Sequence, residues 1–329
     1  MGNREVMVSI DHLKTYFQGG KGFGKKQVIK AVDDVSLDIY RGETFGLVGE
    51  SGCGKSTLGR TIVKLHEPTE GKILVRGKDI TKLSGDQLKT FRQDVQIIFQ
   101  DPHASLNPRM TVGEIIREPI AIHCPYYTRE VQDNRVAHIL RMVGLKPDHI
   151  RRYPHEFSGG QRQRISIART LALDPEFIIC DEPVSALDVS IQAQIINLLK
   201  EIQRELRATY LFISHNLSMV RYVSDRIGVM YLGHIVEVGD SKELYENPMH
   251  PYTQALLSAV PVPDPEAGKA RERITLPGEL PSPLDPPSGC PFRTRCPHAM
   301  DRCAQAMPQL REVNGRQVAC HRYDEQETR

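Results

Sequence analysis

The stretch GESGCGKST, from Gly49 to Thr57, has the residue types and the spacing of a phosphate-binding loop. It matches G-x-x-x-x-G-K-[S/T], follows the apolar run TFGLVG and precedes a helical pattern that begins at Lys55. Its glycines let successive backbone amides face one anion, and the helix N-terminus adds partial positive charge. Lys55 supplies a cation for the β- and γ-phosphates, and the Ser56 hydroxyl is a ligand for Mg²⁺. The residues expected to contact the nucleotide are Gly49, Ser51, Gly52, Cys53, Gly54, Lys55, Ser56 and Thr57.

Two adjacent carboxylates, Asp181 and Glu182, follow the apolar run FIIC. Because successive strand residues point to opposite faces, the two side chains are expected to serve different purposes. Asp181 is predicted to hold Mg²⁺, directly or through water, and Glu182 to polarise a water in line with the γ-phosphate. By itself, Glu182 would be better explained as a charge that favours a helix dipole. Its predicted role as a general base therefore depends on the phosphate loop.

A second anion site is predicted at SGGQ, because this segment also opens a helix whose apolar residues continue through RISIARTLAL. The first loop already wraps the phosphates of one nucleotide, so the second site would bind a γ-phosphate held by another chain. Two chains related by a twofold or pseudo-twofold axis would then close over two ATP molecules. The residues of this site are Ser158, Gly159, Gly160 and Gln161.

The chain has seven cysteines, and four of them lie near its C-terminal end in the pattern C-x₅-C-x₆-C-x₁₆-C. The N-terminal sequence MGNREVMVSI has no apolar run of signal-peptide length, so a cytosolic chain is expected, in which metal-ligating thiolates are favoured over disulfides. Four thiolates suit a [4Fe–4S] cluster or tetrahedral zinc, and the missing C-x₂₋₄-C knuckle favours iron–sulfur. Buried thiols without a metal are the alternative, and His298 and His321 are nearby but are explained more simply as surface residues. The four cysteines are Cys290, Cys296, Cys303 and Cys320.

An α/β fold is expected to position these motifs. The segments VMVSIDHLKTYF and AVDDVSLDIY alternate apolar and polar residues, which predicts half-buried antiparallel strands. The runs TFGLVG, EFIICDEP and TYLFISHN are apolar and precede helical patterns, which predicts a mainly parallel sheet buried on both faces. Residues 103–157 contain helical segments and are expected to form a subdomain inserted into this core.

Composition divides the chain near residue 260. Residues 261–288 contain eight prolines, which predicts an extended linker or an irregular wrap. We therefore expect an ATPase domain over residues 1–260, and a proline-rich linker with a cysteine-rich, metal-binding extension over residues 261–329. The net charge of +2 does not favour nucleic acid as a partner, and no apolar stretch approaches the length of a membrane-spanning helix.

The stretch HEFSGGQRQRISIARTLALDPEFIICDEPVSALDVSIQ resembles the ATP-binding subunits of ABC transporters. Residues 157–161 match the signature motif, with phenylalanine where leucine is commoner, and residues 185–188 match the D-loop, which ends at Asp188. The resemblance covers residues 6–260 and contains every diagnostic segment in order. It implies the fold of a P-loop NTPase, with ATP and Mg²⁺ as its ligands.

Three further positions take their expected roles from this resemblance. Gln100, at the end of VQIIFQ, matches the Q-loop glutamine, which would join the magnesium shell and report on it to the helical subdomain. His215 in FISHN matches the switch histidine, which would fix the γ-phosphate and the attacking water. Phe17 lies where the family stacks an aromatic ring on adenine, and its neighbour Tyr16 is the alternative.

The C-terminal part narrows the resemblance to one group of importers. HPYTQALLSAVP and the later LPGELPSPLDPPSGCPFRTRCPHAMDRC resemble the C-terminal extension of dipeptide and oligopeptide importer ATPases, in which iron–sulfur clusters are known. The motif sequences look like the F-type subunit, which pairs with a D-type ATPase. The resemblance implies a subunit at the cytoplasmic face of the cell membrane that works with two permeases and an extracytoplasmic solute-binding protein. Peptides are the expected solute, with nickel or another small solute as the alternative.

Two rival classes of ABC protein fit the sequence less well. DNA-repair members carry a long coiled coil between the phosphate loop and the signature, whereas only residues 58–156 separate them here. Translation-factor members carry two ATPase units, and this chain has one. Exporter ATPases are usually fused to membrane helices and lack the cysteine-rich tail.

Overall fold

The computed structural model describes residues 4–19, 27–260 and 274–324. The first part of the predicted proline-rich linker, residues 261–273, lies outside the described residues. The chain divides into two compact units, each of which is described by itself. The first unit comprises Met1–Met7, Tyr40–Glu43 and Lys82–Ile213, and the second comprises Val8–Ile39, Thr44–Thr81 and Ser214–Arg329.

The first unit is built on three neighbouring parallel strands, β6, β7 and β8. Their bounds are Val95–Ile98, Phe177–Asp181 and Thr209–Ile213, and every residue of β7 and β8 is buried. Continuous burial explains why these strands are apolar runs without alternation, as expected for the interior of a parallel sheet. The helices that directly precede β7 and β8 are α6 (Gly159–Leu171) and α7 (Val189–Leu206).

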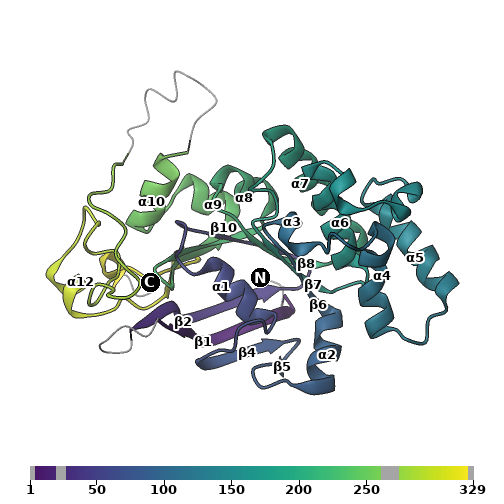
Figure 1. The fold of residues 1–329 in the computed structure, drawn as a ribbon. Coiled ribbons are helices and arrows are strands. Elements are labelled where there is room, and N and C mark those ends of the chain that lie inside the picture. Colours follow the sequence, from purple (N-terminus) through teal and green to yellow (C-terminus); the bar gives the residue numbers. More distant parts are fainter. Residues whose placement is uncertain (1–3, 20–26, 261–273, 325–329) are drawn as a thin grey trace. The chain divides into compact units, whose positions relative to one another are not determined.

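A helical region follows β6 in the first unit, as the sequence predicted (Figure 1). Helix α4 starts with a capping box in which the Thr111 backbone amide donates to the Glu114 carboxylate at 2.7 Å. Helix α4 contacts both α5 and α6, and α6 is the helix that begins at the signature segment. The helical elements from Lys82 to the signature are α2 (Gly85–Asp94), α3 (Pro102–Ser105), α4 (Val112–His123), α5 (Arg129–Met142), η1 (Pro147–Arg151) and η2 (Pro154–Glu156).

The second unit contains a four-stranded sheet in the order β2-β1-β4-β5 and a further set of strands in the order β11-β12-β10-β9-β3. In the second set β3 is parallel to β9, and the other pairs are antiparallel. Strands β1 and β2 alternate buried and more exposed positions, as their sequence predicted. The strands are β1 (Val6–Gln18), β2 (Val28–Tyr40), β3 (Thr44–Val48), β4 (Glu70–Val75), β5 (Lys78–Asp79), β9 (Arg226–Tyr231), β10 (His234–Asp240), β11 (Arg311–Val313) and β12 (Arg316–Val318).

The cysteine-rich extension contributes the hairpin β11–β12 to this unit, which the sequence analysis did not predict. Asn314 and Gly315 form its turn, with φ of 51° and 74°, the combination that a two-residue hairpin turn requires. Because β12 pairs with β10, the extension continues a sheet of the ATPase core. The helices of the second unit are α1 (Lys55–Ile62), α8 (Leu217–Val223), α9 (Ser241–Glu246), α10 (Pro251–Ser258), α12 (Asp301–Gln305) and η3 (His321–Tyr323). Across the described ranges, no helix has both the length and the apolar character needed to span a bilayer.

Candidate nucleotide-binding site

The phosphate loop lies between the fully buried strand β3 and helix α1, as predicted. Gly54 has φ of 107°, and a Cβ atom there would lie 2.0 Å from the Ala31 carbonyl oxygen. Gly49 has φ of 154°, and its Cβ would lie 2.2 Å from the Met230 carbonyl oxygen. Both positions therefore require glycine, because any side chain would force the surrounding backbone apart.

Lys55 is held at this loop by the loop's own backbone. Its side chain is buried, and Nζ donates to the carbonyl oxygens of Gly49 and Glu50, each at 2.9 Å. Nζ also lies 3.7 Å from the sulfur of Cys53. Burial raises the pKa of the Cys53 thiol, which favours its neutral form.

The two candidates for adenine stacking have different surroundings. The Tyr16 hydroxyl donates to the Asp33 carboxylate, and Lys30 Nζ lies 5.5 Å from the centre of the Tyr16 ring. The Phe17 ring is partly exposed and makes an edge contact with the His66 ring, at 5.1 Å between centres. Tyr16 is therefore part of a polar network, and the choice between the two rings for adenine stacking stays a prediction.

In the first unit, the ends of neighbouring strands bring Gln100 and Glu182 together. Asp181 is fully buried at the end of β7, and Glu182 follows in a left-handed conformation with φ of 47°. The Glu182 amide donates to the Ile213 carbonyl oxygen at 3.0 Å. Gln100 follows β6, and its Nε2 donates to Glu182 Oε2 at 3.1 Å. Two residues predicted for different roles are thus hydrogen-bonded, a pairing that the sequence analysis missed.

The signature segment opens helix α6 with a capping box. The Gln161 amide donates to Ser158 Oγ at 3.4 Å, and the Ser158 amide donates to Gln161 Oε1 at 3.1 Å. A Cβ atom on Gly160 would lie 2.5 Å from Ile191 Cγ2 on α7, so glycine permits the close approach of the two helices. Ser158 is exposed.

The D-loop and the switch histidine precede helices α7 and α8. Asp188 is exposed at the start of α7, and the adjacent Val189 is 80% exposed, an unusual position for a large apolar side chain. His215 is exposed in the second unit, next to Asn216, whose side chain caps α8 by accepting from the Met219 amide at 3.1 Å. The cap fixes the backbone that carries His215.

The four C-terminal cysteines are free thiols that lie close enough to affect one another electrostatically. Burial raises the pKa of Cys290 to about 12, and the other three thiols add to this effect. The Cys290 amide donates to the Cys303 carbonyl oxygen at 2.8 Å. Within residues 4–19, 27–260 and 274–324, however, no three His, Cys, Asp or Glu side chains are arranged to hold a metal ion. The described geometry therefore supplies a group of thiols but not a formed metal site.

The prediction that His298 and His321 are surface residues is right for the first and wrong for the second. His298 is exposed, but His321 is buried. Its Nδ1 lies 2.7 Å from Asp324 Oδ2, and its Nε2 lies 2.9 Å from the Ala306 carbonyl oxygen. Both ring nitrogens therefore have hydrogen-bond partners within the extension.

The fold and the phosphate loop define an ATPase of the ABC class, and comparison with known proteins agrees. Residues 32–185 match the family model described as ABC transporter, and residues 236–303 match the one described as oligopeptide/dipeptide transporter, C-terminal region. The oligopeptide transport ATP-binding protein AppF of Bacillus subtilis is 56% identical over 98% of this chain and 98% of its own length. OppF of Salmonella typhimurium is 53% identical over 98% of this chain and 97% of its own length. The chain belongs to the family of oligopeptide and dipeptide transporter ATP-binding proteins.

Solved structures support the fold of the ATPase part. The dimeric post-hydrolysis state of the ATP-binding cassette MJ0796, bound to ADP and Pi, is 30% identical with a TM-score of 0.64 and covers 71% of this chain and 99% of its own. The cbiO1 protein of Clostridium perfringens is 27% identical with a TM-score of 0.64 and covers 74% of this chain and 92% of its own.

Proposed function

We propose that this ATPase energises the import of dipeptides or oligopeptides across the cytoplasmic membrane. The observation that carries the proposal is similarity to oligopeptide transport ATP-binding proteins over almost the whole chain, including the C-terminal extension. The chain acts from the cytoplasmic face, with two permease subunits and a solute-binding protein as partners. Nickel or another small solute is the second candidate for the cargo.

The roles of the phosphate-loop residues, Asp181 and Glu182 are proposed from their chemistry. Those of Phe17, Gln100 and His215 are proposed from the resemblance to ABC transporter ATPases. Lys55 and the loop amides bind the β- and γ-phosphates, and Phe17 stacks on adenine. Mg²⁺ takes oxygen ligands, and each unit carries candidates for it: Ser56 in the second unit, and Asp181 and Gln100 in the first. When bound, the ion would neutralise charge on the phosphate oxygens. Glu182 accepts a proton from the attacking water, and this role is supported by its hydrogen bond to Gln100, which orients the carboxylate. His215 fixes the water and the γ-phosphate.

A partner chain completes the site. Ser158, Asp188 and Val189 are exposed on the first unit, which supports an interface formed by the signature and the D-loop. The signature amides of one chain bind the γ-phosphate held by the other, so ATP closes the pair and hydrolysis reopens it. The partner is a D-type ATPase related to this chain by a pseudo-twofold axis.

Peptide uptake tests the proposed function. Cells that lack this chain are expected to lose ATP-dependent uptake of a radiolabelled tripeptide, because no ATP hydrolysis then drives the permease. The wild-type chain restores uptake, and a Lys55→Met chain does not. Normal tripeptide uptake in the deletion strain, combined with lost nickel uptake, would contradict the peptide assignment in favour of the second candidate.

We further propose that Cys290, Cys296, Cys303 and Cys320 hold a [4Fe–4S] cluster, with zinc as the alternative. The proposal is supported by four thiols in one small region and by the preference of such clusters for cysteine thiolates. Metal binding would draw the thiols into a common coordination shell and deprotonate them. The cluster would cross-link a segment that has only a small hydrophobic core of its own.

Metal analysis of the anaerobically purified chain tests this assignment. The wild-type protein is expected to be brown, with visible iron–sulfur absorbance and iron and sulfide in equal amounts. Cys303→Ala is expected to lose the colour, because it removes one of four ligands. Cys124→Ala is the matched control, since Cys124 lies outside the extension, and it should keep the colour. Colourless protein with stoichiometric zinc would overturn the choice of cluster.

A further inference from the structure

The cysteine-rich extension contacts the phosphate loop directly. Arg295, the residue before Cys296, places Nη1 2.9 Å from Glu50 Oε2 and 3.2 Å from Glu50 Oε1. Glu50 is the second residue of the phosphate-loop motif. The side chains of Arg295 and Glu50 are only 10% and 27% exposed, so the ion pair is largely shielded from water. Such a pair is stronger and more selective in geometry than one on an open surface.

A second group holds the backbone of the same residue. The Glu50 amide donates to the Tyr252 hydroxyl oxygen at 2.9 Å. The Tyr252 ring is fully buried and packs on Tyr231 and Phe292, with centres 4.7 and 5.4 Å apart. Phe292 belongs to the extension, three residues before Arg295. Glu50 is thus fixed through both its side chain and its amide by residues from the C-terminal part of the chain.

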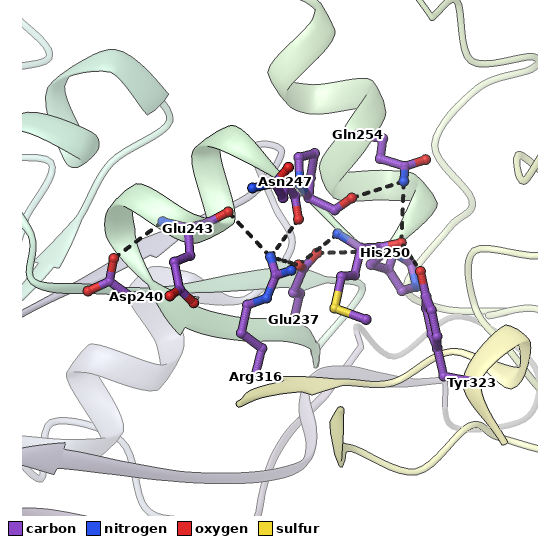
Figure 2. Close-up of polar contacts among 10 residues, drawn as sticks. Glu237, Asp240, Glu243, Asn247, His250, Gln254, Arg316 and Tyr323 are labelled. Carbon is purple, nitrogen blue, oxygen red and sulfur yellow. Dashed lines mark hydrogen bonds and ion pairs between the residues drawn. The ribbon is translucent and has the colours of Figure 1, made fainter. Parts of the chain in front are cut away.

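The extension is itself anchored close to the start of helix α10, as Figure 2 shows. Arg316 Nη1 donates to the carbonyl oxygen of Asn247 at 2.5 Å and lies 3.8 Å from the buried carboxylate of Glu237. Glu237 also accepts from the amides of Met249 and His250, both at 2.9 Å. Arg316 and Glu237 therefore tie the hairpin β11–β12 to the segment that leads into Tyr252.

We propose that Arg295 and Tyr252 are positioning residues of the ATP site, which hold Glu50 so that the phosphate loop is ordered before nucleotide binds. The Glu50 carbonyl oxygen is one of the two acceptors that fix Lys55 Nζ, so the position of Glu50 also sets the position of the phosphate-binding cation. A loop that is already ordered loses less conformational entropy on binding. The extension thereby supports the ATPase site in addition to carrying the proposed metal site. This inference rests on the proposed ATP site at the loop.

Nucleotide binding to the full-length chain tests the proposal. Arg295→Ala is expected to raise the dissociation constants of MgATP and MgADP about tenfold, the equivalent of one lost charge-assisted hydrogen bond. Both nucleotides are affected because both place a β-phosphate on the loop. Arg293→Ala is the matched control: Arg293 donates to the Ser288 carbonyl oxygen at 2.8 Å within the extension, and its loss should leave both constants unchanged.

Two further variants separate positioning from general structural support. Glu50→Ala removes the acceptor of Arg295 and should weaken binding, and adding Arg295→Ala to it should weaken binding little further, because Arg295 acts on the loop through Glu50. Tyr252→Phe keeps the buried ring but should speed hydrogen exchange at the Glu50 amide. If Arg295→Ala binds nucleotide like the wild type, or if the two single effects multiply, this inference is wrong. If the wild-type chain itself fails to bind MgATP, the proposed ATP site is wrong instead.

Discussion

Replacing Glu182 with glutamine is expected to lower the steady-state ATPase rate by about 10²–10⁴-fold and to leave ATP affinity nearly unchanged. Glutamine has almost the same shape as glutamate but cannot take a proton from the attacking water. Its side-chain oxygen can still accept the hydrogen bond from Gln100, which is 3.1 Å long in the wild type. The variant should therefore lose the proton transfer from water but keep the hydrogen bond to Gln100. Phosphate release and equilibrium nucleotide binding measure the two effects separately.

The same variant also tests ATP-driven association. Because ATP at its own phosphate loop is no longer hydrolysed, Glu182→Gln mixed with the proposed partner ATPase and MgATP should elute in gel filtration as a longer-lived complex than the wild type does. Glu205→Gln is the matched control: Glu205 is exposed on α7, and its charge change should affect neither turnover nor elution. ATPase activity at the wild-type rate in Glu182→Gln would contradict the general-base assignment. Failure of any ATP-dependent association would contradict the shared site.

The motifs that could be predicted from the sequence are those whose geometry is local. Gly49 and Gly54 are needed because the backbone of the phosphate loop leaves no space for a side chain. Both positions belong to one short sequence motif. The capping box at Ser158 is equally local, since its hydrogen bonds join residues three positions apart. For these sites the residue types and spacing are sufficient.

Contacts between distant segments could not be predicted in the same way. The Gln100–Glu182 hydrogen bond depends on the parallel register that sets Ile98 beside Cys180, which no local pattern specifies. The Arg295–Glu50 pair joins residues 245 positions apart. Arginine and glutamate are common surface residues, and only the folded chain shows that these two are paired and largely buried.

The hairpin of the C-terminal extension could have been predicted from its own short sequence. The high proline content favoured an irregular segment, yet Asn314-Gly315 between REV and RQV is a strong pattern for a tight hairpin. The buried His321 had no such signal, because its burial follows from Asp324 and from the Ala306 carbonyl oxygen, which lie beside it only after folding.

Replacing Lys55 with methionine is expected to weaken MgATP binding by about 10²-fold and to abolish measurable ATPase activity. In the proposed site the ammonium group would make charge-assisted hydrogen bonds to the β- and γ-phosphates, each contributing about 1.5–3 kcal/mol. Methionine fills the buried volume and is a good helix former, so α1 should still begin at this position. Calorimetric titration with MgATP measures the loss of affinity, and thermal unfolding checks that the chain is folded.

Lys55→Arg is expected to fail as well, although it keeps the charge. Nζ of Lys55 lies 2.9 Å from the Gly49 and Glu50 carbonyl oxygens, and the wider planar guanidinium does not fit a site shaped for a single ammonium. Lys78→Met is the matched control, since Lys78 is exposed on β5 and its loss removes the same charge from the same unit. If Lys55→Arg hydrolysed ATP normally, charge alone would explain the site, and the positioning of Lys55 by Glu50 would have no catalytic consequence. If both arginine and methionine variants fail while Lys78→Met is normal, the site depends on where the loop backbone holds this cation.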